Sequence, residues 1–433
     1  MLKTIRNAFK IPELRSKLVY VIIILVLYRL GSQIPVPFID PEVLRNYFAS
    51  SALTGTLFSY LSMLSGESFT RATLFALSVS PYITASIVMQ LLTIAIPYFE
   101  RLQKDGEEGR KKINTITRFV TVGLGLVTAI GYYKYMTSID GAVSAFGCSV
   151  WGGFVIVACY GAGAALIMWL AEKIEENGIG NGISLILFVN ILSTGWSTAA
   201  TLFNQFKAGG WNILFAILSI VIGLAIIAFV VFITNSERRI PVQYAKRVVG
   251  RKMYGGQSSN LPLKLNMSGV MPIIFASSIV SLPQTIALIF GEPKEGTFWY
   301  KFVEAFSPTS WIYVVLFGIL ILAFSYFYIT ISFDPVEVSN NLKKNGGFVP
   351  GIRPGKPTAD YIKKALNRIT LIGAIFLVFI ALFPMIVNIC LKNQLGALSM
   401  GGSSLLILVG VALETAHEIE AQMTMRHYKG FLE

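Results

Sequence analysis

The sequence predicts an all-α, polytopic membrane protein with ten transmembrane helices. Hydrophobic residues make up 54% of the 433 residues and charged residues only 14%, whereas roughly a quarter of an ordinary globular protein is charged. The mean hydropathy is +0.65, which excludes both a soluble surface and intrinsic disorder. Ten stretches approach the length of about 20 apolar residues that a helix needs to cross the hydrocarbon core.

Six of these stretches are almost continuously apolar: 18–34, 118–136, 150–170, 212–233, 310–332 and 369–389. Four are interrupted by polar residues, glycine or proline: 72–97, 183–202, 269–290 and 400–420. Polar groups inside a bilayer must meet protein or water. The interrupted helices therefore either pack tightly through small residues or line a hydrated path, and four of them in one chain favour the path. The first stretch is too long for a cleavable signal peptide.

Charge predicts the orientation of these helices. Of the 36 Lys and Arg residues, 28 lie on one side, in 1–17, 100–118, 171–182, 234–268, 334–368 and after the tenth helix. Basic residues accumulate in cytoplasmic connections, so both termini are expected in the cytoplasm. The ten spans divide into halves of five, 1–205 and 206–433, and an odd number per half gives the halves opposite topology. Such inverted repeats are common in transport proteins. The prediction of inverted repeats in this chain depends on the number of spans alone.

The stretch between the first two spans is about half apolar but too short and too polar to cross a membrane. It comprises residues 52–70, ALTGTLFSYLSMLSGESFT. It is either an amphipathic helix lying at the outer interface or a re-entrant segment packed inside the protein, and the residues alone leave both open.

Two connections carry most of the positive charge. They are 234–268, with the run SERRIPVQYAKRVVGRK, and 334–368, with NLKKNGGFVPGIRPGKPTADYIKK. Positive charge here is expected from orientation alone, yet connections of this length tend to be functional or disordered. Pro350, Pro354 and Pro357 stiffen the second. A long, basic projection suits docking of ribosomal RNA or an acidic cytosolic protein.

Catalytic motifs are scarce, and we expect no enzyme activity, cofactor or metal site. No GxxxxGK[ST] motif occurs, and GIGNGI (178–183) lacks the spacing and the preceding strand of a dinucleotide site. The three cysteines form no CxxC pair. His417 with Glu414, Glu418 and Glu420 is interpreted as a solvated helix end. Arg29 and Arg71 are interpreted as side chains snorkelling to headgroups.

Several segments together resemble the SecY/Sec61-alpha family of protein-conducting channels, over essentially residues 1–433. The motifs that carry the resemblance are RRIPVQYAKR (238–247), LPLKLNMSGVMPIIFASSI (261–279), FVPGIRPGKPTADYI (348–362), FALSVSPYITASIVMQLLT (75–93), EKIEENGIGNGISLI (172–186) and GGSSLLILVGV (401–411). The resemblance implies a clamshell of two inverted halves around a central pore in the bacterial cytoplasmic membrane. It implies conduction of unfolded polypeptide, lateral release of apolar segments into lipid, and no catalysis of its own.

The resemblance also implies partners. SecE and SecG would accompany the chain, and SecA or the ribosome would drive transport of nascent polypeptides that carry signal peptides. SecDF, YidC and membrane lipids complete the expected set. Two rival functions remain in view. A secondary transporter of a small solute would need charged residues at midplane, which the sequence does not show. A ribosome-binding scaffold without a pore would not need four mixed-polarity helices.

Site residues follow from the resemblance position by position. The pore ring falls on six aliphatic residues, with Val79 and Leu187 replacing the usual isoleucine: Val79, Ile83, Ile183, Leu187, Ile274 and Ile407. The plug falls on 56–70, with Leu57, Phe58, Tyr60, Leu61, Met63, Leu64, Ser65 and Gly66. The surface that docks SecA and the ribosome comprises Arg238, Arg239, Lys246, Arg247, Arg251 and Arg353. Polar contacts that close the lateral gate are assigned to Gln90, Ser277 and Ser278.

Overall fold

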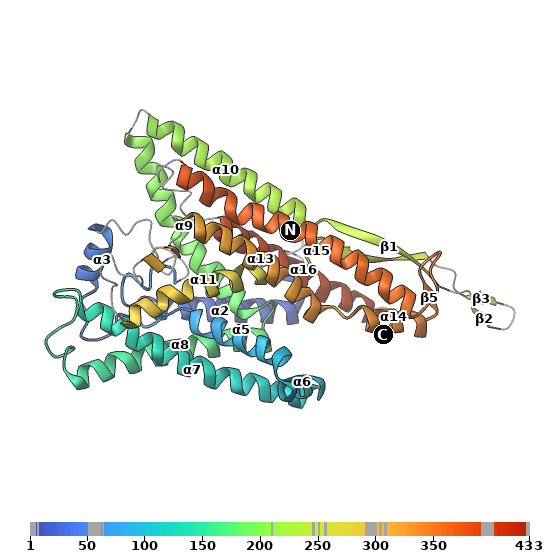
Figure 1. The fold of residues 1–433 in the computed structure, drawn as a ribbon, viewed down its shortest axis with the longest axis horizontal. Coiled ribbons are helices and arrows are strands. Elements are labelled where there is room, and N and C mark those ends of the chain that lie inside the picture. Colours follow the sequence, from blue (N-terminus) through green and yellow to red (C-terminus); the bar gives the residue numbers. More distant parts are fainter. Residues whose placement is uncertain are drawn as a thin grey trace.

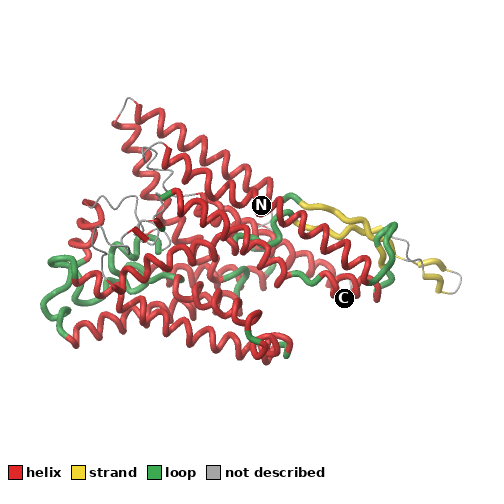
Figure 2. Tube along the Cα trace, viewed as in Figure 1, coloured by secondary structure: helices red, strands yellow, loops and turns green. Residues whose placement is uncertain are grey.

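A computed structural model describes residues 6, 8–50, 62, 65–208, 211–244, 247–249, 252–254, 258–290, 301–302, 305–306, 310–390 and 402–429. Long helices lie side by side and make up most of the molecule (Figures 1 and 2). The helices are α2 (Pro12–Gly31), α3 (Pro41–Ser50), α5 (Ser80–Ala95), α6 (Pro97–Lys104), α7 (Glu107–Thr137), α8 (Val150–Asn177), α9 (Gly182–Ala208), α10 (Trp211–Thr234), α11 (Met271–Phe290), α13 (Trp311–Ser332), α14 (Pro335–Lys344), α15 (Lys356–Cys390) and α16 (Gly402–Lys429).

Each of the ten predicted stretches coincides, wholly or in part, with one of ten helices, namely α2, α5, α7, α8, α9, α10, α11, α13, α15 and α16. By length and composition, six helical segments of the described chain can each cross a membrane, or seven if the bent pair α5–α6 counts as one. In α11, the apolar helical segment Met271–Pro283 is shorter than these spans. The fold is thus that of a polytopic membrane protein, and the full count of ten spans stays a prediction.

The span predicted over 72–97 is wrong at its beginning. Helix α5 starts at Ser80, because Pro81 in its first turn cannot continue a helix from the preceding residues. Residues 65–79 instead form consecutive turns, with positive φ at Gly66, Glu67, Ala72 and Ser78. At the other end, the chain bends by 98° between α5 and α6, where Pro97 starts the new helix.

The expectation of an all-α chain is wrong in the two basic connections, which form strands. These are β1 (Glu237–Tyr244), β2 (Arg247–Val249), β3 (Lys252–Tyr254), β4 (Ser258–Lys264) and β5 (Gly347–Phe348). One antiparallel sheet has the order β4-β1-β5, and β2 pairs with β3. Alternation in β1 explains the strand: Ile240 and Val242 are buried while their neighbours are exposed. The charge of this stretch concealed that two-residue period.

The sheet projects from one end of the helical bundle, on the side where α6 and α14 also lie, while α3 and the α7–α8 connection lie at the opposite end (Figures 1 and 2). The main hydrophobic core draws residues from α2, α5, α8, α9, α10, α11, α13, α15 and α16. A second core joins α3, α7 and α8 to the turns before α5. Helix α11 contacts both α5 and α7, so segments of the two halves meet there directly.

Candidate functional site

Six aliphatic side chains predicted to form a ring lie in the same hydrophobic cluster. Val79, Ile83, Leu187, Ile274 and Ile407 are each at most 5% exposed, and Ile183 is partly buried. They come from the beginnings of α5, α9, α11 and α16, so residues about 330 positions apart reach one core. All six therefore belong to, or pack against, one extended core that both halves share, and their arrangement as a ring stays a prediction.

Local sequence places the two ring residues of α9. A Cβ on Gly182, at the start of the helix, would lie 2.0 Å from the carbonyl oxygen of Ala171. Only glycine permits this approach, which holds the first turn of α9 against α8. Ile183 follows immediately, and Leu187 lies four residues further, one turn along the same helical face.

Residues 65–79 form a chain of turns, and we call them the cap segment; its Phe75 and Val79 belong to this cluster. The hydroxyl groups of Tyr132 on α7 and Tyr160 on α8 donate to the carbonyl oxygens of Phe69 and Ala72, the latter at 3.3 Å. Within the segment, the Ser65 hydroxyl accepts from the amide of Phe69 at 3.1 Å. Two aromatic hydroxyls from neighbouring helices thus fix the segment by its backbone.

Of the eight residues assigned to the plug, Ser65 and Gly66 begin the cap segment and are buried. Leu57, Phe58, Tyr60, Leu61, Met63 and Leu64 lie outside the described residues.

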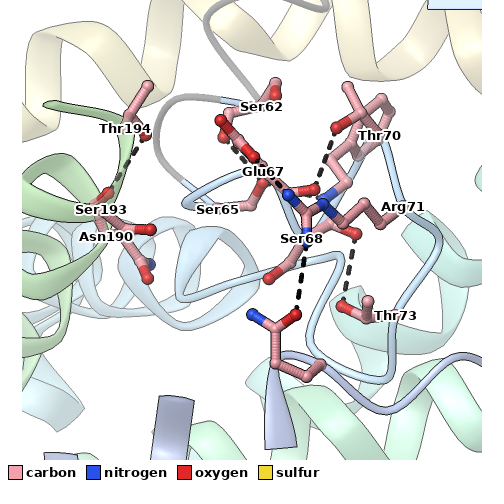
Figure 3. Close-up of polar contacts among 12 residues, drawn as sticks. Ser62, Ser65, Glu67, Ser68, Thr70, Arg71, Thr73, Asn190, Ser193 and Thr194 are labelled. Atoms are coloured by element: carbon pink, nitrogen blue, oxygen red, sulfur yellow. Dashed lines mark hydrogen bonds and ion pairs between the residues drawn. The ribbon is translucent and has the colours of Figure 1, made fainter. Parts of the chain in front are cut away.

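Beneath Gly66 lies a group of polar side chains, Tyr28, Arg29, Ser78, Asn190 and Ser193, which we call the polar cradle. The Tyr28 hydroxyl donates to Asn190 Oδ1 at 2.9 Å, and Asn190 Nδ2 donates to Ser78 Oγ at 3.3 Å. The Arg29 guanidinium donates to Ser193 Oγ. Asn190 and Ser193 project from α9 on the side of the cap segment (Figure 3). The cradle thereby joins α2 and α9 to Ser78, near the end of the cap segment.

Gly66 fits the cradle because it has no side chain. A Cβ at this position would lie 3.0 Å from Arg29 Nη1, 3.0 Å from Asn190 Oδ1 and 3.1 Å from Asn190 Cα, and the residue has a φ of +62°. A left-handed φ favours glycine by itself. The close contacts and the positive φ therefore both favour glycine at position 66.

The interpretation of Arg29 as a residue that snorkels to headgroups is wrong. Its guanidinium donates to the partly buried Ser193 hydroxyl and approaches Gly66, so the side chain is held by contacts within the protein. Arg71 is 43% exposed and pairs with Glu67 at 2.9 Å. Sequence reasoning missed the cradle, although one signal was present: Asn190 follows Leu187 by three residues on one face of an otherwise apolar helix.

The polar residues assigned to the lateral gate form hydrogen bonds within their own helices. Gln90 donates to the Ser86 hydroxyl at 3.4 Å. The hydroxyls of Ser277 and Ser278 both donate to the carbonyl oxygen of Ile274, at 2.8 and 2.9 Å. In this conformation these three side chains therefore stabilise α5 and α11 locally.

The two basic connections form a single surface, since β1 pairs with β4 of its own connection and with β5 of the other. Gln243 lies opposite Phe348 in the β1–β5 register. Beneath the sheet, Ile240, Leu263 and Val349 pack with residues of α15 such as Ile362. A hydrophobic core therefore holds the sheet against the beginning of α15.

The basic residues on this surface are mostly accessible. Arg238, Arg239 and Arg353 are exposed, and Arg239 pairs with Glu237 at 2.7 Å. The backbone of Arg247 belongs to β2, opposite Tyr254. Lys246 and Arg251 lie outside the described residues.

The charged end of α16 is held by polar contacts within the protein. His417 Nε2 lies 3.2 Å from Asn235 Oδ1, and His417 Nδ1 lies 3.7 Å from Glu420. Among the residues that the structure describes, no three His, Cys, Asp or Glu side chains converge as metal ligands.

Comparison with known proteins gives the same family throughout. A family model described as SecY matches residues 73–416. The protein translocase subunit SecY of Streptomyces galbus is 42% identical over 446 residues, covering 100% of both chains. That of Thermotoga maritima is 39% identical over 442 residues, covering 100% of this chain and 98% of the relative.

Solved structures share the fold. One described as "The structure of a protein conducting channel" has a TM-score of 0.66 at 19% identity and covers 94% of this chain and 92% of its own. Another concerns the plug domain that stabilises the closed state of the SecY channel; its TM-score is 0.64 at 20% identity, with the same coverage.

Proposed function

The chain belongs to the SecY family, and we propose that it is the channel subunit of a protein translocase, which conducts unfolded polypeptides across a membrane. The observation that carries this proposal is that six aliphatic side chains from the beginnings of four helices all belong to, or pack against, the one core that both halves share. A narrow apolar constriction excludes water and ions by dewetting. Aliphatic side chains can also yield to a passing chain without binding it strongly.

In this proposal the ten helices form two inverted halves, 1–205 and 206–433, with both termini in the cytoplasm. The ring Val79, Ile83, Ile183, Leu187, Ile274 and Ile407 closes the pore between them. The stretch 56–70 is the plug, and its last residues are seated on the polar cradle. The contact of α11 with α5 and α7 supports a lateral gate at that seam, through which apolar segments pass into lipid.

We assign docking of the driving partner to the surface of the β4-β1-β5 sheet. Its exposed arginines, Arg238, Arg239 and Arg353, suit an acidic protein such as SecA or the RNA of a ribosome. A signal peptide at the gate and a partner on the sheet would both favour the open state, because each binds that state more tightly. The energy for transport comes from the partner, and SecE and SecG complete the complex.

Protease protection of an unfolded secretory precursor tests the function. The purified chain, with SecE and SecG, is placed in liposomes with SecA and ATP. We expect precursor to become protected only when both ATP and this chain are present. Absence of protection, with the chain correctly inserted and SecA bound, would contradict protein conduction and point to a small solute.

The variant Arg353→Glu tests the docking surface in the same assay. We expect it to impair SecA-driven protection without unfolding the chain, because it places a negative charge on the basic surface. Lys134→Glu is the matched control. Lys134 is also exposed, but it lies in the last turn of α7, at the end of the bundle opposite the sheet. Normal transport by a correctly inserted Arg353→Glu variant would remove Arg353 from the docking site.

A further inference from the structure

A shallow groove of about 430 Å³ lies between α13 and α15, and no residue of the ring, the cap segment or the sheet lines it. Tyr326 lines it from α13, and Asp360, Lys363, Lys364, Arg368 and Leu371 line it from α15. The groove lies near the end of α15 that carries the sheet (Figure 1). The proposed function gives this groove no role.

The groove is positively charged. Lys363, Lys364 and Arg368 are all exposed, and none of the three forms an ion pair with another residue that the structure describes. Asp360 is the one carboxylate among the lining residues. With three cations and one anion, the groove has a net positive charge that suits an anionic molecule.

Below the cations, the exposed face of α15 becomes apolar. Leu371, Ile372, Ile375 and Phe379 are 45%, 48%, 53% and 56% exposed. Together with Lys364 and Arg368 they recur at three- and four-residue intervals, so they form one stripe along the helix. The change from basic to apolar side chains occurs within one turn, between Arg368 and Leu371. In the proposed orientation, that turn lies at the boundary between headgroups and hydrocarbon on the cytoplasmic side.

Tyr326 supports this placement from the neighbouring helix. Its hydroxyl donates to the carbonyl oxygen of Asn367 at 3.5 Å, which puts the tyrosine at the level of the basic turn. Tyrosine is enriched at membrane interfaces, where its ring meets lipid and its hydroxyl meets polar groups. The groove therefore has cations and a hydroxyl at the headgroup level and leads into an apolar stripe.

We propose that this groove binds the headgroup of an anionic phospholipid from the cytoplasmic leaflet. Lys363, Lys364 and Arg368 hold the lipid phosphate, and an acyl chain lies along Leu371, Ile375 and Phe379. Free phosphate or a nucleic acid would use the cations but not the stripe. The proposal rests on the proposed membrane orientation but not on protein conduction, because a chain that conducts nothing would still bind the lipid.

Lipid titration of the purified complex tests the proposal without SecA or ATP. The measurement is binding of phosphatidylglycerol in detergent by native mass spectrometry, with phosphatidylcholine as the uncharged comparison. In the triple variant Lys363→Gln, Lys364→Gln and Arg368→Gln we expect phosphatidylglycerol affinity to fall by roughly a hundredfold, as three lost contacts of a cation with an anionic membrane imply. Phosphatidylcholine binding should not change.

The matched control is Lys343→Gln, Lys344→Gln and Lys356→Gln, which removes the same charge from exposed positions outside the groove. We expect it to retain phosphatidylglycerol affinity within about threefold. Equal loss in both triple variants would reduce the effect to general surface charge and overturn the proposal. Loss of a co-purified protein subunit, with lipid binding intact, would assign the groove to that subunit.

A second variant separates a lipid from free phosphate. Ile375→Ser and Phe379→Ser together change the exposed apolar stripe and leave all cations in place, and neither side chain is part of the groove. We expect phosphatidylglycerol affinity to fall at least tenfold because about two acyl-chain contacts are lost. Unchanged lipid affinity in this variant, or displacement of lipid by millimolar inorganic phosphate, would overturn the proposal in favour of a phosphate site.

Discussion

Helix α9 carries two kinds of buried residue one turn apart, and they close the molecule in different ways. Leu187 belongs to a hydrophobic cluster whose apolar contacts have no preferred direction. Asn190 is fully buried and is bonded to Tyr28 and Ser78, with Gly66 of the cap segment directly above it. The hydrophobic cluster excludes water, whereas the hydrogen bonds of Asn190 hold the cap segment in one position.

This difference predicts different tolerances. An apolar core accepts substitutions that conserve volume and shape, at a cost below about 1.5 kcal/mol. A buried polar network loses the full desolvation cost of any partner left unbonded, about 1–3 kcal/mol. We therefore expect the ring to tolerate exchange among hydrophobic residues, and the cradle to fail when one partner is removed.

The largest expected effect comes from Gly66→Val. A β-branched residue at φ of +62° is strained, and its Cβ would lie only 3.0 Å from atoms of Asn190 and Arg29, which would have to shift. We expect the strain and the close contacts together to destabilise the packing of the cap segment on the polar cradle by on the order of 3 kcal/mol. The measurement is ion leak through the complex in planar bilayers without substrate or partner, and leak should rise strongly.

The control for this substitution is Gly141→Val in the outer connection between α7 and α8. Gly141 has a φ of +80°, but no atom of the described chain lies within 4 Å of the position that a Cβ would take, so this variant carries the backbone strain without the close contacts. We expect no added leak. If both variants leak equally, the contact between Gly66 and the cradle does not hold the cap segment.

Asn190→Leu is expected to have the next largest effect. It leaves the Tyr28 hydroxyl and the Ser78 hydroxyl without their Asn190 partner, at a cost of about 2 kcal/mol. Leak should rise, though less than in Gly66→Val. Adding Tyr28→Phe removes the hydroxyl that lost its Asn190 acceptor, so the double variant should leak less than Asn190→Leu alone. A double variant that leaks more would show that the network is not what seats the segment.

The cradle also marks the limit of what the sequence predicts. Hydropathy located ten helices, since a long apolar run can be recognised from neighbouring residues alone. The predicted span at α5 was too long because the helix begins only at Ser80, with Pro81 in its first turn. The sheet was missed because charge concealed the alternation of Ile240 and Val242. The cradle was missed because Tyr28, Ser78 and Asn190 are far apart in the chain and only the fold brings them together. Arg29 was misassigned for the same reason.

A smaller effect is expected from Leu187→Met in the ring. The two side chains are similar in volume, and Met adapts to irregular gaps, so the closed state should change by less than about 1 kcal/mol and leak should stay at the wild-type level. Leu187→Asn is the matched comparison, because a polar side chain allows the constriction to fill with water. Leak from Leu187→Met as large as that from Leu187→Asn would show that shape, not hydrophobicity, closes the ring.

The smallest effect is expected on the sheet, where Glu237 competes for Arg239. The pair is 2.7 Å apart, but the side chains of Arg239 and Glu237 are 67% and 32% exposed, and exposed pairs contribute about 0–1 kcal/mol. Glu237→Gln should leave leak and stability unchanged and free Arg239 for an anionic partner, so SecA or ribosome binding should tighten by up to about fivefold at low salt. Arg239→Gln should weaken it by a similar factor. Both differences should shrink at high salt because exposed charges are screened; effects that persist there, or that move leak, would show that the sheet and the cradle are not independent.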